Sequence, residues 1–397
     1  MNIILQGSSK SWSGSSNLCL NLVDGQPVIY WTIKKIVENF PGAGIVIAAP
    51  SFDEGGRLSD IAREFKGRVD VFFGHDDSPL LRMIAAHDKF FKKEEYFLRI
   101  DALHLFFDPA DLKRMYRLAV KKTLDCLKFA DDYPPPFTAD IYRIDALVRL
   151  KDKLPPGSPF MVHPKYFMMK DPGFKCGYFK GRKLNKRSMI FARDRAKDIY
   201  LERDESDRRS IRSGDQLSFH YTLALPYIKK TDKVLDTACG TGFGLSRLAK
   251  AARKVWGADL SQVAIDIAKR RVKGTANIKL STADATDLPF KSKMFDVVTS
   301  FETLEHVAAD AFINELWRVL KPGGRLIIST PQNSLGEFPV NPHHVREYSL
   351  AEFKRLFEGL FGIERIIGIK QGTIFFENDP FGNNTFAVLV KKSRSQK

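Results

Sequence analysis

The sequence predicts an α/β protein built from two domains. The first observation is length, because 397 residues at roughly 150 residues per domain allow two or three units with cores of their own. The second is composition: 44% apolar and 28% charged residues are typical of a globular chain and exclude a disordered one. The third is the alternation of short apolar, β-branched runs with longer amphipathic segments, which favours strands and helices in turn.

The first unit is expected over residues 1–180. Its predicted elements are a strand at Asn2–Leu5, a Gly/Ser-rich loop at Gly7–Ser16, a helix at Val28–Asn39, and strands at Gly44–Ala49, Val69–Phe73 and Tyr96–Ile100. Residues 181–214 are dense in charge and poor in periodic apolar residues, which predicts a basic linker. Residues 151–200 carry 13 basic and 4 acidic residues, in a chain with a net charge of +16. Such a segment is typical of a solvated linker or of a surface for nucleic acid, an anionic membrane or a sugar nucleotide.

The second unit, residues 215–397, alternates more regularly. Its predicted elements are, in order, a helix at Leu217–Tyr227, a strand at Lys233–Asp236, a glycine loop at Cys239–Gly244, a helix at Leu245–Ala252, a strand at Lys254–Ala258, a helix at Gln262–Arg271, strands at Ile278–Thr282 and Phe295–Ser300, a helix at Ala309–Leu320 and a strand at Arg325–Ser329. This order predicts a doubly wound, Rossmann-like parallel sheet with ligands at the carboxyl ends of its strands. Two later apolar runs, Ile363–Ile369 and Thr385–Val390, have no helix between them and predict an antiparallel edge.

The four cysteines indicate a reducing compartment. They stand at positions 19, 126, 176 and 239 without a CxxC pair, which argues against a disulfide framework and against a thiolate metal site. The start of the sequence lacks a basic segment before a long apolar one, and no apolar run approaches the roughly 18 residues of a membrane span. We therefore expect a cytoplasmic protein without a membrane span.

A glycine loop and an aspartate predict an adenosine site. Gly240, Gly242 and Gly244 stand at alternate positions between a strand and a helix, where glycine permits positive φ and close approach of a ligand. Asp259 follows Gly242 by seventeen residues, at the end of the next strand, where a carboxylate can accept both hydroxyls of a ribose. Asp236 ends the strand before the loop and suits an ammonium group. That residue and the GxGxG spacing favour S-adenosylmethionine over a dinucleotide.

Residues 215–392 resemble class I S-adenosylmethionine-dependent methyltransferases of the type 11 group, and most closely those that accompany sugar and surface-polysaccharide biosynthesis in bacteria. Six motifs carry the resemblance, in order: Val234–Gly244, Gly257–Ser261, Ala283–Phe290, Phe295–His306, Leu320–Gly324 and Asn341–Ser349. The resemblance implies that the cofactor contacts come from the following residues: Asp236, Ala238, Gly240, Gly242, Gly244, Asp259, Leu260, Asp284, Ala285 and Phe301. It also implies that the aspartate and the alanine at 284 and 285 flank the adenine, and that residues 301–306 form the floor under the transferred methyl group.

Two segments offer side chains for an acceptor. Transfer of a methyl group from a sulfonium is an in-line displacement, so positioning does much of the work and a base takes the proton of an acceptor hydroxyl. Glu305 and His306 follow the fourth strand of the second sheet, and His343 and His344 follow the fifth. His306 is the first candidate for the base, and the other two histidines come next. The sequence requires no metal.

The first unit resembles, more faintly, the cytidylyltransferase-like family that activates acidic sugars and includes spore-coat polysaccharide proteins. The matching segments are the opening strand and loop, Gly25–Pro27, Gly74–Arg82, Arg99–Ile100, Asp108–Pro109 and Tyr133–Asp140. Positions where that family carries basic residues for a triphosphate hold Ser8, Ser13 and Asn17, and its metal aspartate falls on Leu103. Without those charges, phosphoryl chemistry loses most of its electrostatic stabilisation. We expect a nucleotidyltransferase-like domain that is inactive in transfer and that binds a nucleotide sugar or docks a partner.

Together these patterns predict an S-adenosylmethionine-dependent methyltransferase that acts on a sugar, a sugar nucleotide or a glycan in bacterial polysaccharide biosynthesis. An RNA methyltransferase that uses the basic middle segment is one alternative, and a non-catalytic scaffold that binds nucleotide sugars is another. The complete cofactor motifs argue against the scaffold. No recognisable RNA-binding motif accompanies the basic residues, which makes a nucleic-acid partner the weaker interpretation. The acceptor, the choice of O- or N-methylation and the oligomeric state stay open.

Overall fold

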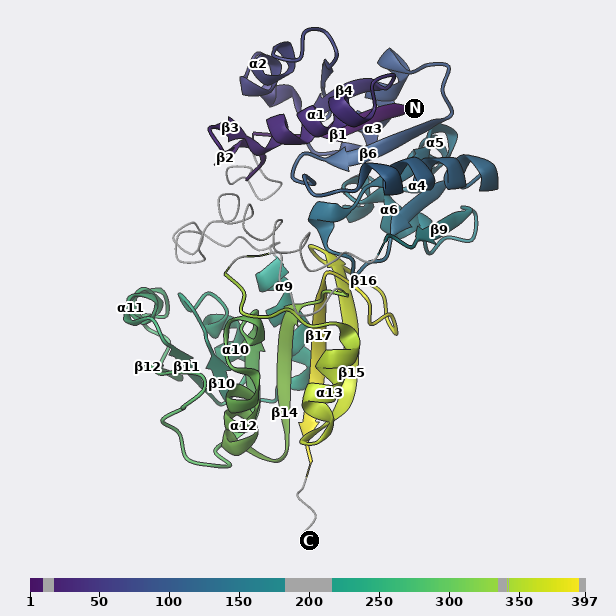
Figure 1. Ribbon diagram of the computed structural model, residues 1–397. Helices are drawn as coiled ribbons and strands as arrows, with labels where there is room; N and C mark the ends of the chain where they lie inside the picture. The colour runs from purple at the N-terminus through teal and green to yellow at the C-terminus, as the bar shows by residue number, and fades with distance from the viewer. Residues whose placement is uncertain (10–17, 183–215, 335–340, 342, 393–397) are drawn as a thin grey trace. The chain divides into compact units, whose positions relative to one another are not determined.

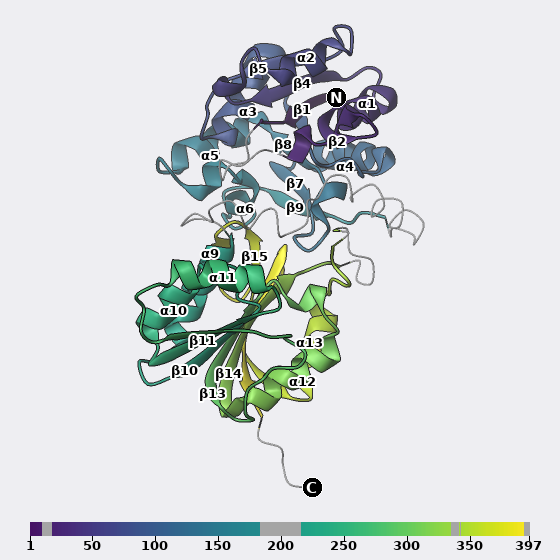
Figure 2. The same cartoon turned by 90° about the vertical axis from the view of Figure 1, so that its left-hand side faces the viewer.

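The computed structural model describes residues 1–9, 18–182, 216–334, 341 and 343–392. The chain divides into two compact units, Met1–Tyr200 and Leu201–Lys397. Each unit has one large sheet with helices on both faces (Figures 1 and 2). No helix within the described ranges is both long enough and apolar enough to cross a membrane. Ser13, Asn17 and nearly all of the expected linker lie outside the described residues, so the predicted domain bounds stay a prediction.

The sheet of the first unit has seven strands, of which β8 runs antiparallel to both of its neighbours. In spatial order the strands are β5 (Asp70–Phe73), β4 (Gly44–Ala49), β1 (Asn2–Gln6), β6 (Tyr96–Asp101), β8 (Asp140–Arg143), β7 (Cys126–Phe129) and β9 (Cys176–Phe179). In β1, Ile3 and Leu5 pack on one face of the sheet and Ile4 packs on the other, and all three are fully buried. Burial on both faces explains the uninterrupted apolar sequence of this strand.

Helices cover both faces of this first sheet. One face carries α1 (Val28–Asn39), α2 (Arg57–Arg63) and α4 (Pro109–Lys122), and the other carries α3 (Pro79–Phe90), α5 (Ile144–Lys153) and α6 (Pro164–Met168). A small sheet of β2 (Leu22–Val23) and β3 (Gln26–Pro27) precedes α1. The four strands and the helix predicted for this unit are present. The apolar pattern of the sequence does not predict β7, β8 and β9. Each of these strands has only four residues and includes polar or charged side chains, so its apolar run is too short to be recognised.

The sheet of the second unit is mixed. In spatial order its strands are β12 (Ile278–Thr282), β11 (Lys254–Asp259), β10 (Lys233–Thr237), β13 (Phe295–Phe301), β14 (Leu320–Pro331), β17 (Asn384–Lys391), β15 (Phe361–Gln371) and β16 (Ile374–Phe375). The first five are parallel, and β17 lies antiparallel between β14 and β15. The predicted parallel sheet with an antiparallel edge is therefore confirmed.

Helices also cover both faces of the second sheet (Figure 2). One face carries α9 (Gln216–Ala224), α10 (Leu245–Ala251) and α11 (Gln262–Arg271), and the other carries α12 (Ala309–Val319) and α13 (Leu350–Glu358). Two elements differ most from the sequence prediction. The helix that begins near Leu217 continues after Ala224 as a 3-10 turn, because Pro226 has no N–H for an α-helical hydrogen bond. Strand β14 begins before Arg325, because Leu320 already pairs with Phe295 of β13.

The chain order places a crevice at the carboxyl edge of the second sheet. From β10 the chain moves outward through β11 and β12, and it then crosses to the other side of β10 for β13 and β14. The loops that leave β10 and β13 therefore diverge, and ligands of open α/β sheets bind at such a switch point. In the first sheet the equivalent position lies between β1 and β6.

Candidate active site

The loop between β10 and α10 has a left-handed backbone. Ala238, Gly240 and Gly242 have φ values of 54°, 52° and 75°, a region that glycine adopts without the steric cost of a Cβ. A Cβ on Gly242 would lie 2.7 Å from the Cβ of Ala268 in α11. The loop therefore needs glycine both for its backbone conformation and for its close approach to α11.

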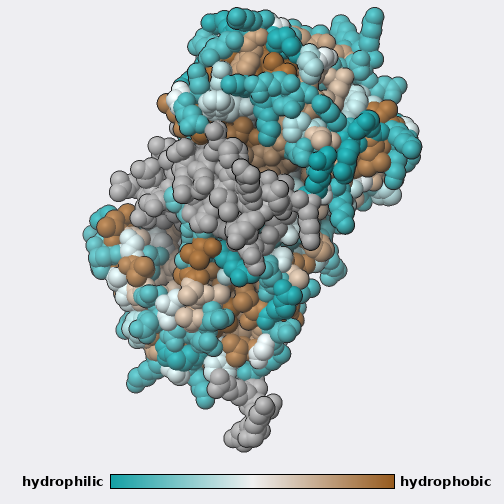
Figure 3. Space-filling model, viewed as in Figure 1, coloured by the Kyte–Doolittle hydropathy of each residue, from teal (hydrophilic) through white to brown (hydrophobic). Residues whose placement is uncertain are grey.

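Asp259, at the end of β11, is tied to the same loop. Its Oδ2 accepts a hydrogen bond of 2.8 Å from the backbone N–H of Gly240, and its Oδ1 accepts one of 2.9 Å from that of Ser261. These two bonds fix the carboxylate at the crevice, where its remaining lone pairs can accept ribose hydroxyls. The next side chain, Leu260, is 71% exposed, and Figure 3 shows apolar surface where Figure 1 places α11. A charged group and an apolar surface thus lie side by side.

Asp236, at the end of β10, is 1% exposed and accepts hydrogen bonds from two hydroxyl groups. Thr299 of β13 donates at 2.6 Å and Tyr221 of α9 donates at 2.9 Å. Burial raises the pKa of Asp236 to about 7, although the two hydroxyl groups act in the opposite direction. Gly244 makes room for this contact, because a Cβ there would lie 2.1 Å from the Tyr221 ring. Sequence reasoning misses Tyr221, since only the fold brings α9 to Asp236.

The remaining predicted cofactor residues occupy different surroundings. Asp284 is exposed, and its Oδ1 accepts two bonds of 2.7 Å from the backbone N–H and the hydroxyl of Thr286. These bonds lower the pKa of the Asp284 carboxyl, and the bond from the backbone N–H has the larger effect. Ala285 is half-buried and packs against the apolar core on the α12 and α13 face of the second sheet. Phe301 is 5% exposed, and its ring packs edge to face on Tyr221 with centroids 4.8 Å apart. Cofactor contacts from these residues stay predictions.

Glu302 links three strands at the same edge of the sheet. It has a φ of 51°, directly after β13. Its carboxylate accepts a hydrogen bond of 2.8 Å from the hydroxyl of Ser329 in β14 and one of 2.7 Å from the side-chain amide of Asn384 in β17. The left-handed backbone at Glu302 thus turns its carboxylate toward the neighbouring strands. Sequence reasoning misses this residue as well, because its partner in β17 lies 82 residues away.

Three of the four predicted acceptor-side residues form one cluster, Glu305–His306–His344. The ring nitrogens and carboxylate oxygens that could bind an ion lie within 4.8 Å of one another. The Glu305 side chain is 1% exposed, and its Oε2 accepts a hydrogen bond of 2.9 Å from the hydroxyl of Thr330. The two imidazole rings meet edge to face with centroids 4.8 Å apart. The structure thus brings together residues from the ends of β13 and from the segment after β14.

Hydrogen bonds orient both imidazoles of this cluster. Nδ1 of His306 lies 3.0 Å from the carbonyl oxygen of His343, which can only accept, so Nδ1 carries the proton. Nδ1 of His344 donates to Oε1 of Glu347 at 2.6 Å, and Nε2 of His344 accepts from the amide of Asn341 at 3.0 Å. In its neutral form, each ring therefore has its lone pair on Nε2. His343, the fourth predicted residue, contributes its backbone carbonyl.

Charged side chains also meet at the switch point of the first sheet. Arg99 pairs with Asp101 at 3.0 Å and lies 3.5 Å from Asp140, whose carboxylate also pairs with Lys165 at 3.1 Å. The two cations and the two anions neutralise one another. Leu103, at the position expected for a metal aspartate, packs against apolar core residues.

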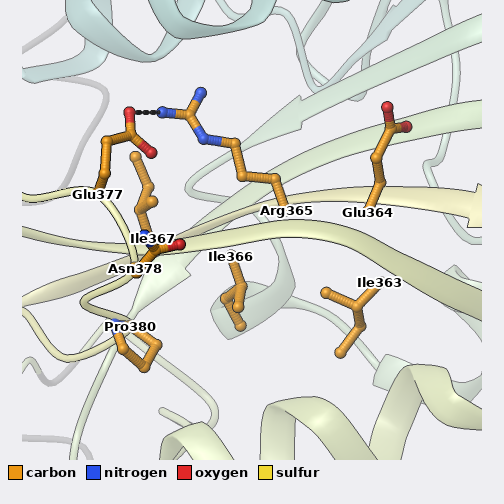
Figure 4. A pocket seen from close by; sticks show the side chains of 8 residues that line it. All are labelled: Ile363, Glu364, Arg365, Ile366, Ile367, Glu377, Asn378 and Pro380. Carbon is orange, nitrogen blue, oxygen red and sulfur yellow. Dashed lines mark hydrogen bonds and ion pairs between the residues drawn. The ribbon is translucent and has the colours of Figure 1, made fainter.

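A surface pocket lies elsewhere in the second unit (Figure 4). It is lined by residues 363–367 of β15 and by Glu377, Asn378 and Pro380. The Arg365 side chain extends from β15 toward Glu377 and forms an ion pair with it. None of the predicted site residues lines it.

Comparison with known proteins relates part of the second unit to methyltransferases. Residues 235–328 match the family model of a methyltransferase domain. A protein of Mycolicibacterium smegmatis named "Probable S-adenosylmethionine-dependent methyltransferase" is 34% identical over 152 residues, which make up 37% of this chain and 58% of that protein. A demethylmenaquinone methyltransferase of Clavibacter sepedonicus is 42% identical over 104 residues, which make up 25% of this chain and 42% of that protein. A solved structure of an S-adenosylmethionine-dependent methyltransferase from Aquifex aeolicus is 20% identical, with a TM-score of 0.40, and the match covers 48% of this chain and 100% of that one.

The chain spans about half the length of the curated relatives it matches. The residues matched by the family model include Asp236, the glycine loop, Asp259 and His306, whereas His344 lies beyond them. The left-handed glycine loop and the carboxylate fixed at the end of β11 fit the cofactor of this family. The second unit therefore contains a class I S-adenosylmethionine-dependent methyltransferase domain, and its cofactor is S-adenosylmethionine.

Proposed function

We propose that this chain methylates a hydroxyl or amino group of a sugar, a sugar nucleotide or a glycan in bacterial polysaccharide biosynthesis. S-adenosylmethionine, when bound, supplies a methyl group on a positively charged sulfur. The observation that carries the proposal is the position of the Glu305–His306–His344 cluster. It follows the carboxyl end of β13, which pairs with the strand of Asp236, β10, and β10 in turn pairs with β11, which ends at Asp259. Donor-side and acceptor-side groups thus share one edge of one sheet.

On the donor side, each polar group has a proposed task. Asp259 accepts the ribose hydroxyls, because its orientation is fixed by two backbone N–H groups. Asp236 faces the ammonium group of the methionine part, and an ammonium nearby favours its charged form. The exposed Leu260 and the half-buried Ala285 supply apolar surface for the adenine, with Asp284 beside it.

On the acceptor side, His306 is the proposed base in the metal-free enzyme. Its Nδ1 proton is held by the carbonyl of His343, so Nε2 has the lone pair that can take a proton from an acceptor hydroxyl. Oε1 of Glu305 lies 3.8 Å from this Nε2. A buried carboxylate at that distance stabilises the imidazolium that forms. His344 has hydrogen-bond partners on both ring nitrogens, which suits a positioning role.

We also propose that the first unit keeps a nucleotidyltransferase-like fold without transfer activity, which binds a nucleotide sugar or docks a partner. Two observations support this proposal: the apolar surroundings of Leu103, and the charge balance of the cluster around Asp140. None of the four cysteines, all of which lie in the described ranges, forms a disulfide, which suits a cytoplasmic location.

Methyl transfer from labelled S-adenosylmethionine tests the proposal. The acceptor panel contains sugar nucleotides and glycan fragments, with demethylmenaquinone and RNA as competing acceptor classes. We expect label in the sugar class, and a loss of turnover of about a hundredfold or more in His306→Ala with unchanged affinity for S-adenosylmethionine. Label in the quinone or in RNA alone would refute the sugar proposal. Full turnover in His306→Ala would remove the assignment of the base.

A further inference from the structure

We propose that the Glu305–His306–His344 cluster binds a divalent first-row transition-metal ion such as Zn²⁺ or Mn²⁺. Two imidazoles and a carboxylate form a donor set that suits such ions and that leaves coordination positions open for water or substrate. The inference goes beyond the proposed function, because it uses the geometry of the cluster and does not depend on the identity of the acceptor.

Two atoms that face each other in this cluster both present lone pairs. Because Nδ1 of His306 donates to the carbonyl of His343, its Nε2 presents a lone pair, and this atom lies 3.8 Å from Oε1 of Glu305. That distance is too long for a hydrogen bond, so the two atoms are not hydrogen-bonded to each other, whichever of them carries a proton. A cation about 2.1 Å from each atom fits between them.

The hydrogen bonds behind the cluster have the pattern of an outer ligand shell. Metal-binding imidazoles commonly donate their other N–H to a carboxylate or to a backbone carbonyl, which fixes the tautomer and raises the basicity of the ligand. His344 donates to Glu347 at 2.6 Å, and His306 donates to a backbone carbonyl at 3.0 Å. Thr330 donates to Oε2 of Glu305, which leaves Oε1 on the side of His306.

Binding requires one local change. Nε2 of His344 accepts a hydrogen bond of 3.0 Å from the amide of Asn341. This amide is on a side chain and can rotate away, so the lone pair of His344 becomes available to the ion. In the loaded site, Nε2 of His306 would be a ligand and not the base, and the ion would supply Lewis-acid chemistry that lowers the pKa of an acceptor hydroxyl.

Titration calorimetry on the full chain tests the proposal. The protein carries no affinity tag, is treated with a chelator and dialysed, and is titrated with ZnCl₂ and, separately, with MnCl₂. We expect one ion per chain, and affinities at least about tenfold lower in His306→Gln and in His344→Gln, since loss of a ligand costs at least as much as loss of its outer-shell partner. His343→Gln is the matched control, because it keeps the backbone carbonyl that bonds to His306.

Melting temperature and affinity for S-adenosylmethionine show whether each variant is folded. X-ray absorption at the zinc edge should show nitrogen and oxygen ligands only. Absence of stoichiometric binding, wild-type affinity in both histidine variants, or sulfur among the ligands would overturn the proposal. Normal ion binding without any methyl transfer would instead refute the proposed function and leave the metal site intact.

Discussion

Asp259→Ala should reduce the affinity for S-adenosylmethionine by about a hundredfold or more. The carboxylate fixes the glycine loop through Gly240 at 2.8 Å and the start of α11 through Ser261 at 2.9 Å, and it offers lone pairs to two ribose hydroxyls. A hydrogen bond to a charged group contributes about 1.5–3 kcal/mol, so two such bonds contribute about 3–6 kcal/mol. Since about 1.4 kcal/mol corresponds to a factor of ten, the lower value already gives a factor of about a hundred.

Asp259→Asn separates the two roles of the carboxylate. An amide has one acceptor oxygen for the two backbone donors, so one N–H loses its partner and the charge at the ribose disappears. We expect an affinity loss of about tenfold or more, which is smaller than for alanine. Asp266→Asn is the matched control on α11. Its carboxylate accepts hydrogen bonds from Gln262 and Lys269 on the exposed surface, where such interactions contribute little.

Titration calorimetry at constant pH measures these affinities, and thermal unfolding of each ligand-free variant accompanies it. Two outcomes would contradict the role of Asp259. One is an affinity of Asp259→Ala within about threefold of the wild type, well below the loss of two charged hydrogen bonds. The other is an equal loss of affinity in the control variant of Asp266.

Three further predictions concern single positions. Ala238→Gly should raise the free energy of unfolding by about 0.5–1 kcal/mol in denaturant titrations, because glycine removes the steric cost of a φ of 54°. In Asp236, burial raises the pKa from 3.8 to about 7, so the folded chain keeps a proton that the unfolded chain releases. Stability of the ligand-free protein should therefore fall as the pH rises through this window, and Asp236→Asn should weaken that fall in melting temperatures recorded across it. The chain should release no pyrophosphate from CTP, magnesium and sugar acids, because Leu103 offers no carboxylate to the metal; rapid release would show that our alignment of the first unit is misplaced.

The position of Asp259 beside the glycine loop could be predicted from the sequence because the two are close in the chain. Asp259 follows Gly242 by the length of one helix and one strand, α10 and β11. Since β10 and β11 are adjacent and parallel, that separation returns the chain to the loop it left, and the carboxylate meets the N–H of Gly240. The number of residues between the glycine loop and Asp259 thus predicts that the two are in contact.

Contacts that depend on strand order could not be predicted in this way. The two last apolar runs indicate an antiparallel edge, but they do not say which of the two lies next to β14. The structure inserts β17 between β14 and β15, and this order brings Asn384 to Glu302. Tyr221 reaches Asp236 from a helix that precedes the first strand of the sheet. The spacing of these residues along the sequence therefore predicts neither contact.

The direction of individual side chains in loops is a further limit. His343 and His344 are adjacent and identical in type, so the sequence favours the segment without choosing between them. In the structure the ring of His344 joins Glu305 and His306, whereas His343 contributes its carbonyl oxygen. The backbone conformation after β14 determines which of the two rings joins the cluster, and residue type alone does not predict that conformation.

The two units differ in how their switch-point charges are compensated. In the first unit, one carboxylate, Asp140, is paired with both Arg99 and Lys165, so it has little charge left to offer a metal or a reacting group. In the second, a buried carboxylate faces the lone pair of a histidine 3.8 Å away. Such an arrangement can take up a proton or a cation, whereas an internally neutralised one can only bind by exchanging partners. This difference supports our proposals of chemistry at the second sheet and of a first unit without transfer activity.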